Sequence, residues 1–178
     1  MSFVSLVPIY FSERQALLGQ LSDCIECTFR LSVRLRPPWF DPEISFDPSR
    51  GQYNSTLLLA QLLRGPSDGA LRVLGVTSLD LFVPILTYVF GEAQLNGRAA
   101  VVSIERLRNE AYGLPSDETL LRTRLEKEAI HELGHTFGLL HCLDSTCVMH
   151  SSTYAEQIDI KYGHFCTTCR GNVGTDKR

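Results

Sequence analysis

The chain has 178 residues, of which 44% are hydrophobic and 21% charged, and its formal net charge is −3. This length suits one domain of roughly 150 residues with a hydrophobic core, and the composition excludes a disordered chain, a fibre and a coiled coil. The slightly acidic balance provides no basic surface for nucleic acid or an anionic membrane.

The N-terminal segment lacks the pattern of a secretory signal. MSFVSLVPIYFSER has no basic residue before its short apolar run, and the longest apolar stretch, LFVPILTYVF, contains Pro84 and is too short for a membrane span. We therefore expect a cytoplasmic protein. Thiols stay reduced in that compartment, so the six cysteines favour metal binding over disulfides.

The first half of the chain is predicted to mix strands and helices. β-Branched runs and polar-apolar alternation indicate strands, apolar residues at helical spacing indicate helices, and two Asp-Pro steps indicate a loop. The predicted elements are strands over residues 2–10, 28–36 and 71–83, helices over 12–26 and 55–64, and a loop over 39–52.

A β-hairpin and a long helix are predicted next. Residues 87–94 and 98–107 have strand patterns and are joined through Asn96-Gly97, the strongest short hairpin signal. From Ser116 onward, apolar residues at i, i+4 spacing predict an amphipathic helix. Its stripe comprises Leu121, Leu125, Ala129, Leu133, Phe137 and Leu140. Residues 142–178 show too little periodicity for long elements.

The predicted helix contains the motif H-E-x-x-H, from His131 to His135. Residues four apart lie on the same helix face, so both imidazoles can reach one Zn²⁺. That face points away from the apolar stripe and toward a cleft. Glu132 lies next to the ligands and is suited to take a proton from a zinc-bound water.

Gly138 and His141 extend the motif to H-E-x-x-H-x-x-G-x-x-H. Glycine tolerates positive φ, so Gly138 can end the helix and bring His141 to the metal as the third ligand. Met149 follows eight residues later. This longer signature is that of the metzincins, whose Met-turn underlies the zinc site.

Four cysteines then follow at set offsets from the helix. Cys142 and Cys147 precede Met149 as H-C-x4-C-x-M, and Cys166 and Cys169 form C-x-x-C after a gap of 16 residues. Here the sequence resembles the archaemetzincins, in which this gap is about 17. The resemblance implies a second, structural zinc bound by these four thiolates, which agrees with the closed tetrahedral geometry of four-cysteine zinc sites.

The resemblance also implies an α+β fold. We expect a metzincin-like mixed, twisted β-sheet with an antiparallel edge strand, an active-site helix and a small zinc-tied C-terminal subdomain. The whole chain, 1–178, would form one metallopeptidase catalytic domain. Its N-terminal subdomain would be 1–138, and its C-terminal subdomain, with the Met-turn and the four-cysteine zinc site, would be 139–178.

Several alternatives remain open for the cysteines and the other histidines. The four late cysteines could instead form disulfides or be inert buried thiols. Cys24 and Cys27 form another C-x-x-C, which could join Cys166 and Cys169 in a rival metal site, act as a redox pair, or have no special role. His150 and His164 could line the cleft or lie at the surface.

The resulting prediction is a zinc metallopeptidase with two Zn²⁺, one catalytic and one structural. Glu132 would activate the zinc-bound water, and the family resemblance points to restricted, aminopeptidase-like cleavage. In metzincins a peptide lies antiparallel to an edge strand above the zinc, so the resemblance implies a substrate along Thr87–Gln94. No nucleic-acid or membrane partner is expected, and a monomer is expected. The alternative is a zinc-stabilised binding or regulatory domain with little proteolytic activity.

Overall fold

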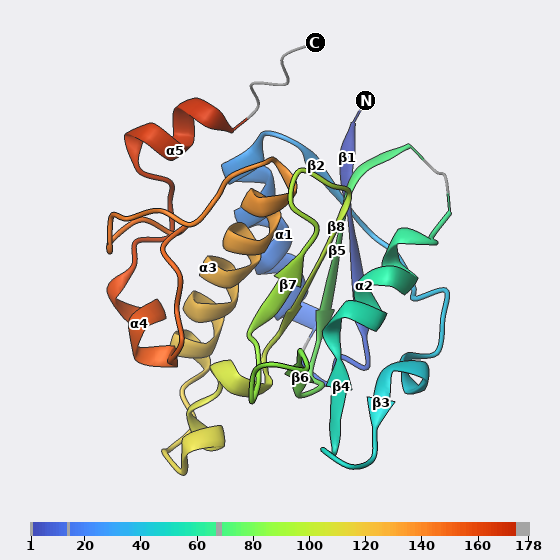
Figure 1. The fold of residues 1–178 in the computed structure, drawn as a ribbon. Coiled ribbons are helices and arrows are strands. Elements are labelled where there is room, and N and C mark those ends of the chain that lie inside the picture. Colours follow the sequence, from blue (N-terminus) through green and yellow to red (C-terminus); the bar gives the residue numbers. More distant parts are fainter. Residues whose placement is uncertain (1, 14, 67–68, 174–178) are drawn as a thin grey trace.

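The computed structural model describes residues 2–13, 15–66 and 69–173. Its centre is a twisted five-stranded sheet in the order β2-β1-β5-β8-β7 (Figure 1). The first four strands are parallel, and β7 pairs antiparallel with β8 at the edge. The mixed sheet with an antiparallel edge strand is therefore confirmed. The strands are β1 (Phe3–Ile9), β2 (Ser32–Leu35), β5 (Ala70–Thr77), β7 (Gly91–Ala93) and β8 (Ala99–Ser103).

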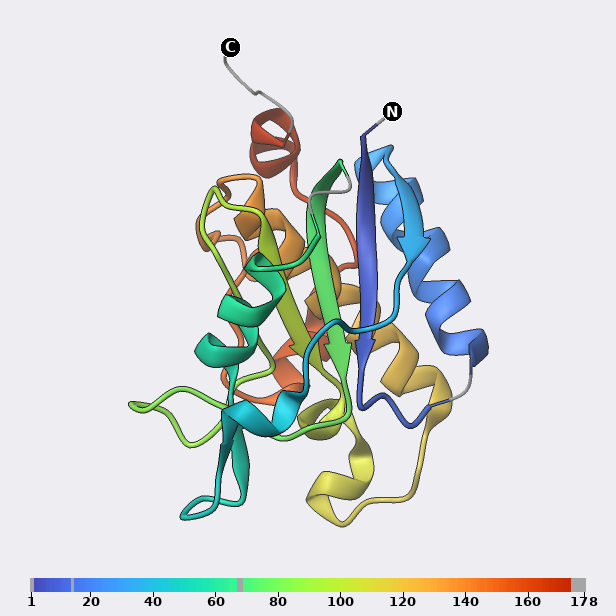
Figure 2. The same cartoon turned by 90° about the vertical axis from the view of Figure 1, so that its right-hand side faces the viewer.

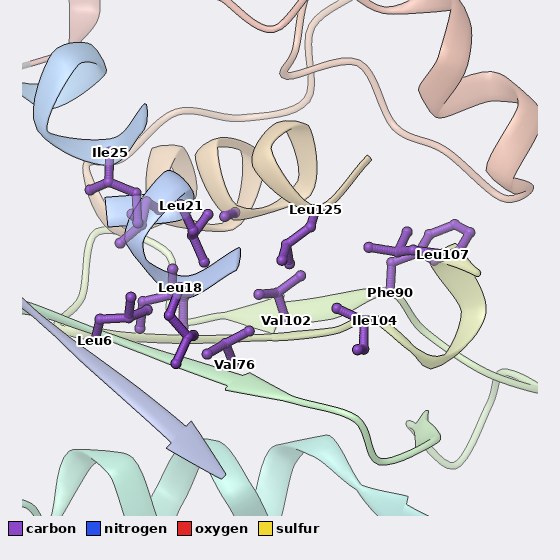
Figure 3. Close-up of a cluster of buried hydrophobic side chains, with 14 of the residues drawn as sticks. Leu6, Leu18, Leu21, Ile25, Val76, Phe90, Val102, Ile104, Leu107 and Leu125 are labelled. Carbon is purple, nitrogen blue, oxygen red and sulfur yellow. The ribbon is translucent and has the colours of Figure 1, made fainter. Parts of the chain in front are cut away.

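Three helices cover the two faces of this sheet. α1 (Gln15–Phe29) and α3 (Glu118–Thr136) lie on one face, and α2 (Ser55–Leu63) lies on the other (Figures 1 and 2). Side chains alternate across a strand, so β1 supplies Leu6 to the core under α1 and α3 and Val7 to the core under α2. Figure 3 shows the first core, where leucines of α1 and Leu125 of α3 meet the sheet.

The loop predicted over 39–52 is partly ordered, so that prediction was wrong in detail. It contains a short 3-10 helix, η1 (Pro42–Ser45), and β3 (Phe46–Asp47), and it runs into β4 (Gln52–Asn54). These strands join β6 (Leu81–Phe82) in a second sheet of order β3-β4-β6. The strand region predicted over 71–83 is accordingly split between two sheets.

Other element boundaries also differ from the sequence predictions. α1 continues to Phe29, and Arg30 takes a positive φ of 58°, so the next strand starts four residues later than expected. The predicted second hairpin strand is shorter because 3-10 turns follow it, η2 (Glu105–Leu107) and η3 (Asn109–Tyr112). The hairpin itself is confirmed, with Gly91 opposite Val102 in the register.

The helix that carries the histidine motif starts later than predicted. Its N-cap is Asp117 rather than Ser116, and the Asp117 side chain accepts a hydrogen bond of 2.9 Å from the Leu120 N–H. The helix ends at Thr136, and Gly138 follows with a φ of 87°. Leu140 lies beyond this turn and is 68% exposed, so its inclusion in the apolar stripe was wrong.

The C-terminal segment contains only two short helices, α4 (Ala155–Ile160) and α5 (Thr167–Asn172), within the part that the structure describes. It is attached to α3 by two ion pairs, Arg124 with Asp159 and Lys161 with Glu128. The absence of long elements in these residues matches the prediction, whereas the subdomain division at residue 138 stays a prediction. No helix in the described ranges is both long and apolar enough to cross a bilayer.

Candidate metal centres

Three histidine side chains converge at the C-terminal end of α3. His131 and His135 lie one turn apart on this helix, with ring centroids 4.6 Å apart. The turn at Gly138 brings back His141, whose ring lies 5.3 Å from His131 and 4.9 Å from His135. The ligand atoms of all three side chains lie within 4.8 Å of one another.

The ring orientations fit a metal ion. The Nδ1 atom of His131 lies 2.9 Å from the Val148 carbonyl, and Nδ1 of His135 lies 2.7 Å from the Leu139 carbonyl. A carbonyl only accepts, so each Nδ1 carries the proton and each Nε2 presents a lone pair. The two Nε2 atoms are 3.1 Å apart, close to the spacing of about 3.3 Å for two nitrogens bound tetrahedrally to zinc.

The electrostatics of the three histidines favour the neutral imidazole. Burial lowers the pKa of His131 well below its ordinary value, and the charge of Lys161 adds to the decrease. Burial also lowers the pKa of His135 and His141. Neutral imidazole is the form that binds a metal, so the protonation state suits the geometry.

The Glu132 carboxylate is buried beside the histidines and lies under the edge strand. Burial raises the pKa of Glu132 well above its ordinary range, with Glu128 and Glu92 adding to the rise. A divalent cation on the neighbouring imidazoles would oppose that shift. A Cβ atom at Gly91 would lie 2.8 Å from Glu132 Oε1, so the missing side chain in β7 makes room for this carboxylate.

A cavity of about 370 Å³ opens beside the histidines. Its walls are residues 86–91, which lead into the edge strand, the segment 151–154, and side chains of α3. A second hollow is lined by the three histidines and by residues of the edge strand and the turn after it, Gly91, Glu92, Ala93 and Leu95. The structure thus brings the predicted edge segment, 87–94, alongside the histidine cluster.

The four late cysteines form the second cluster. The Sγ atoms of Cys142, Cys147, Cys166 and Cys169 lie within 4.8 Å of one another. The Sγ atoms of Cys142 and Cys166 are 3.8 Å apart, which equals the edge of about 3.8 Å in a tetrahedral zinc-thiolate site. A disulfide would need about 2.05 Å, and all six cysteines are free. This donor set fits zinc.

Among these four thiols, Cys166 has a lowered pKa and therefore loses its proton most easily. Cys166 is the N-cap of α5, and a hydrogen bond from the backbone of Cys169 is the main cause that lowers its pKa to about 7. The Sγ atom of Cys147 accepts a hydrogen bond of 3.3 Å from the Cys166 N–H. Backbone donors of this kind stabilise thiolates, the form that binds metal.

The structure does not bring Cys24 and Cys27 together with Cys166 and Cys169 as a metal site. Within the described ranges, the sulfur atoms that meet are those of the four late cysteines, without Cys24 or Cys27. Cys27 is exposed, whereas Cys24 is half-buried against the apolar cluster that contains the four cysteines. Burial raises the pKa of Cys24 to about 11, so the structure gives this thiol no reactive character.

Met149, the predicted Met-turn residue, packs against the helix that carries His131 and His135. It is fully buried among Ile130, Val148 and Phe165. A Cβ atom at Gly134 would lie 2.5 Å from Met149 Sδ, so the glycine inside the motif allows this close approach. This contact brings Met149 close to the α3 backbone between His131 and His135.

Gly134→Ala is therefore expected to destabilise the protein, although alanine normally stabilises a helix interior. The helical gain is about 1 kcal/mol, and overpacking against the fully buried Met149 costs about 1–3 kcal/mol. Gly19→Ala in α1 is the matched control, because no atom lies within 4 Å of the added Cβ. Urea unfolding should show a loss for Gly134→Ala and a gain for Gly19→Ala; a gain for both would contradict the packing argument.

Two further histidines lie near the clusters without joining them. His150 Nδ1 donates to the Cys142 carbonyl at 2.8 Å, and the ring thus supports the cysteine loop. His164 is exposed and stacks on Tyr162 with ring centroids 5.2 Å apart. Neither one lines the cavity beside the three converging histidines.

Sequence reasoning missed a buried ion pair next to this cavity. Lys161 Nζ donates to Glu128 Oε1 at 2.9 Å, and both side chains are almost completely buried. Glu128 precedes His131 by three residues and Glu132 by four, so helical spacing could have placed it on the cleft face. Nothing in the sequence marks Lys161, since its burial depends on tertiary packing.

Comparison with known proteins gives consistent matches. The model of peptidase family M54 matches residues 65–174. An archaemetzincin of Haloquadratum walsbyi is 37% identical over 169 residues, covering 93% of this chain and 96% of the relative. An archaemetzincin of Methanocaldococcus jannaschii is 45% identical over 128 residues, which cover 72% of this chain and 69% of the relative. The crystal structure of archaemetzincin from Methanopyrus kandleri superposes with a TM-score of 0.85 and 36% identity, covering 100% of this chain and 96% of that one.

Proposed function

The chain belongs to peptidase family M54, the archaemetzincins, and is a zinc metallopeptidase; from this premise we propose its site residues and its mode of cleavage. His131, His135 and His141 hold the catalytic zinc, and Glu132 is the general base. The substrates are a restricted set of peptides, cleaved in an aminopeptidase-like manner. The observation that carries the proposal is the convergence of three imidazoles within 4.8 Å beside a buried carboxylate.

Glu132 moves the protons of the reaction. A bound zinc supplies a Lewis acid that polarises the peptide carbonyl and makes water acidic. The Glu132 carboxylate accepts a proton from the attacking water as its oxygen bonds to the carbonyl carbon. It returns that proton to the amide nitrogen as the C–N bond breaks, so the amine leaves neutral. The alternative, a zinc-stabilised binding domain, needs no general base beside the histidines, so the presence of Glu132 favours the peptidase.

The edge strand holds the peptide backbone. Among the described strands, Gly91–Ala93 pairs with β8 alone at the sheet edge, and its residues line the hollow that contains the histidines. A substrate in extended conformation adds to this edge by main-chain hydrogen bonds, which gives affinity with little sequence preference. Selectivity then has to come from the cavity next to it.

A second zinc is bound by the four cysteines and has a structural role. Four thiolates leave no open coordination position, so this ion supplies no reaction chemistry. This ion would connect the loop after α3 to α5. The cysteines of both segments lie in a small apolar cluster that is separate from the core between the sheet, α1 and α3. Six free thiols fit a reducing compartment, and we propose the cytoplasm.

Cleavage of a defined peptide mixture tests the proposal. Zinc-loaded protein is incubated with peptides that have either free or acetylated amino ends, and the products are identified by mass spectrometry. We expect cleavage that stops when zinc is chelated and that favours free amino ends. Cleavage of acetylated peptides at internal bonds with equal efficiency would contradict the aminopeptidase-like mode, and zinc-independent cleavage would contradict the function.

A further inference from the structure

The cavity beside the histidines is lined by two carboxylates, and we call it the side pocket. Its walls are residues 86–91 and 151–154, with Glu128, His131, Glu132 and His141 from α3 and the turn after it. None of these lining residues is Lys or Arg. The backbone and apolar side chains of 86–91 surround two carboxylates, of which Glu132 is already assigned to proton transfer.

The second carboxylate, Glu128, has an unused acceptor. The residue is 3% exposed, and Lys161 Nζ donates to Oε1 at 2.9 Å. Lys161 also donates to the His150 carbonyl at 3.0 Å, which fixes the ammonium group behind Glu128. The described residues supply no hydrogen-bond donor to Oε2. An acceptor that the chain leaves without a donor is available to a donor from outside it.

Ser152 supplies another unsatisfied polar atom in the same pocket. Its Oγ atom is buried and has no hydrogen-bond partner among the described residues. Ser152 and Glu128 both line this pocket, one from the segment 151–154 and the other from α3. A hydroxyl can accept, and two unused acceptors in one pocket call for a group with several donors.

We propose that the side pocket binds a cationic hydrogen-bond donor of the peptide substrate, an ammonium or guanidinium group close to the scissile bond. Such a group offers three or five donors and forms charge-assisted hydrogen bonds with a carboxylate. It has enough donors for Glu128 Oε2 and Ser152 Oγ, the two acceptors that the chain leaves unused in this pocket. The proposal rests on the proposed function and names the chemical class of substrate that this site selects.

Two parts of a peptide can supply this group. One is the side chain of a Lys or Arg residue next to the cleaved bond, and the other is the free α-amino group. Both fit the acceptors of the pocket, and the aminopeptidase-like mode would follow directly from the second. The experiment separates them by changing each source alone.

The test uses one peptide scaffold with Lys or norleucine at each position around the cleaved bond, with free or acetylated amino ends. Norleucine keeps the shape of the lysine chain without its charge. We expect kcat/KM for the preferred cation to exceed that of its neutral counterpart by about tenfold to a hundredfold. An effect of Lys in acetylated peptides identifies the side chain, and an effect of the free end alone identifies the α-amino group.

A variant of Ser152 tests the pocket itself without disturbing the ion pair of Glu128 and Lys161. Ser152→Ala should reduce the preference for the cation by about threefold to tenfold. Ser151→Ala is the matched control, since Ser151 lines the same pocket but is exposed. The control should keep the wild-type preference.

Binding of the same peptides, measured by calorimetry on the zinc-loaded wild type, separates the two proposals. Lys and norleucine peptides could be cleaved with equal kcat/KM and bound with equal Kd, whether the amino end is free or acetylated. That result would overturn the side-pocket proposal but would leave the peptidase function standing. Tighter binding of the cationic peptides without any cleavage would support the pocket and contradict the proposed function. A preference for Glu at these positions would also overturn the inference.

Discussion

Glu132→Gln is expected to lower kcat for peptide cleavage by about 10²–10⁴-fold, the usual contribution of a general acid-base residue. The amide has nearly the same shape as the carboxylate but cannot accept the proton of the attacking water. Glu132 is 6% exposed and lies under Gly91, so the replacement fills the same space. Steady-state cleavage of one peptide by the zinc-loaded variant and by wild type measures the effect.

Two controls make this result specific to proton transfer. Zinc content by elemental analysis should be unchanged in Glu132→Gln, because the three histidines are retained. Glu126→Gln makes the same chemical change on the same helix, where the Glu126 carboxylate faces Arg122 at 3.8 Å, away from the cleft. This control should keep wild-type kcat. Equal activity of Glu132→Gln and wild type would remove Glu132 from the mechanism.

The histidine site could be predicted from sequence because its geometry is local. His131 and His135 are related by a single helical turn, and Gly138 takes the positive φ at which the chain turns back toward them with His141. The hairpin that forms the edge strand was also predictable from Asn96-Gly97. Asn96 takes a φ of 50°, and its N–H donates to the His135 carbonyl, so the hairpin turn lies against the C-terminal end of α3.

The features that were missed depend on contacts between distant parts of the chain. The second sheet forms where two Asp-Pro steps predicted a loop, and the Gln52 side chain links it to distant residues by donating to Asp80 and to the Thr87 carbonyl. Glu128 and Lys161 are 33 residues apart, and each alone has the character of a surface charge. Local patterns carry no information about such pairings, which packing creates.

Cys147→Ser is expected to lower zinc content from two ions per chain to one and to unfold the C-terminal segment. Cys147 is 2% exposed at the centre of the cysteine cluster, and loss of one thiolate opens the coordination sphere. Structural zinc binding is coupled to folding, so a loss of at least about 3 kcal/mol is expected. For a chain of this size that corresponds to a fall in Tm of about 6–12 °C.

The same variant should also lower peptidase activity, because the two proposed metal centres are joined through the backbone. The Val148 carbonyl, which orients His131 through its Nδ1 atom, directly follows Cys147. The Cys142 N–H donates to the Met149 carbonyl at 2.9 Å, so the cysteine loop also holds the Met-turn. Loosening the cysteine cluster therefore frees an orienting partner of His131, a proposed ligand of the catalytic zinc.

Cys27→Ser is the matched control for this prediction, since Cys27 is exposed and lies outside the cluster. It should retain two zinc ions, the wild-type Tm and full activity. Cys24→Ser tests the half-buried thiol beside the cluster and should also retain both ions. If Cys147→Ser kept two zinc ions, or if wild type contained one, the structural zinc would have to be abandoned. In that case the C-terminal segment would rely on its small apolar cluster around Met149 and Phe165 alone.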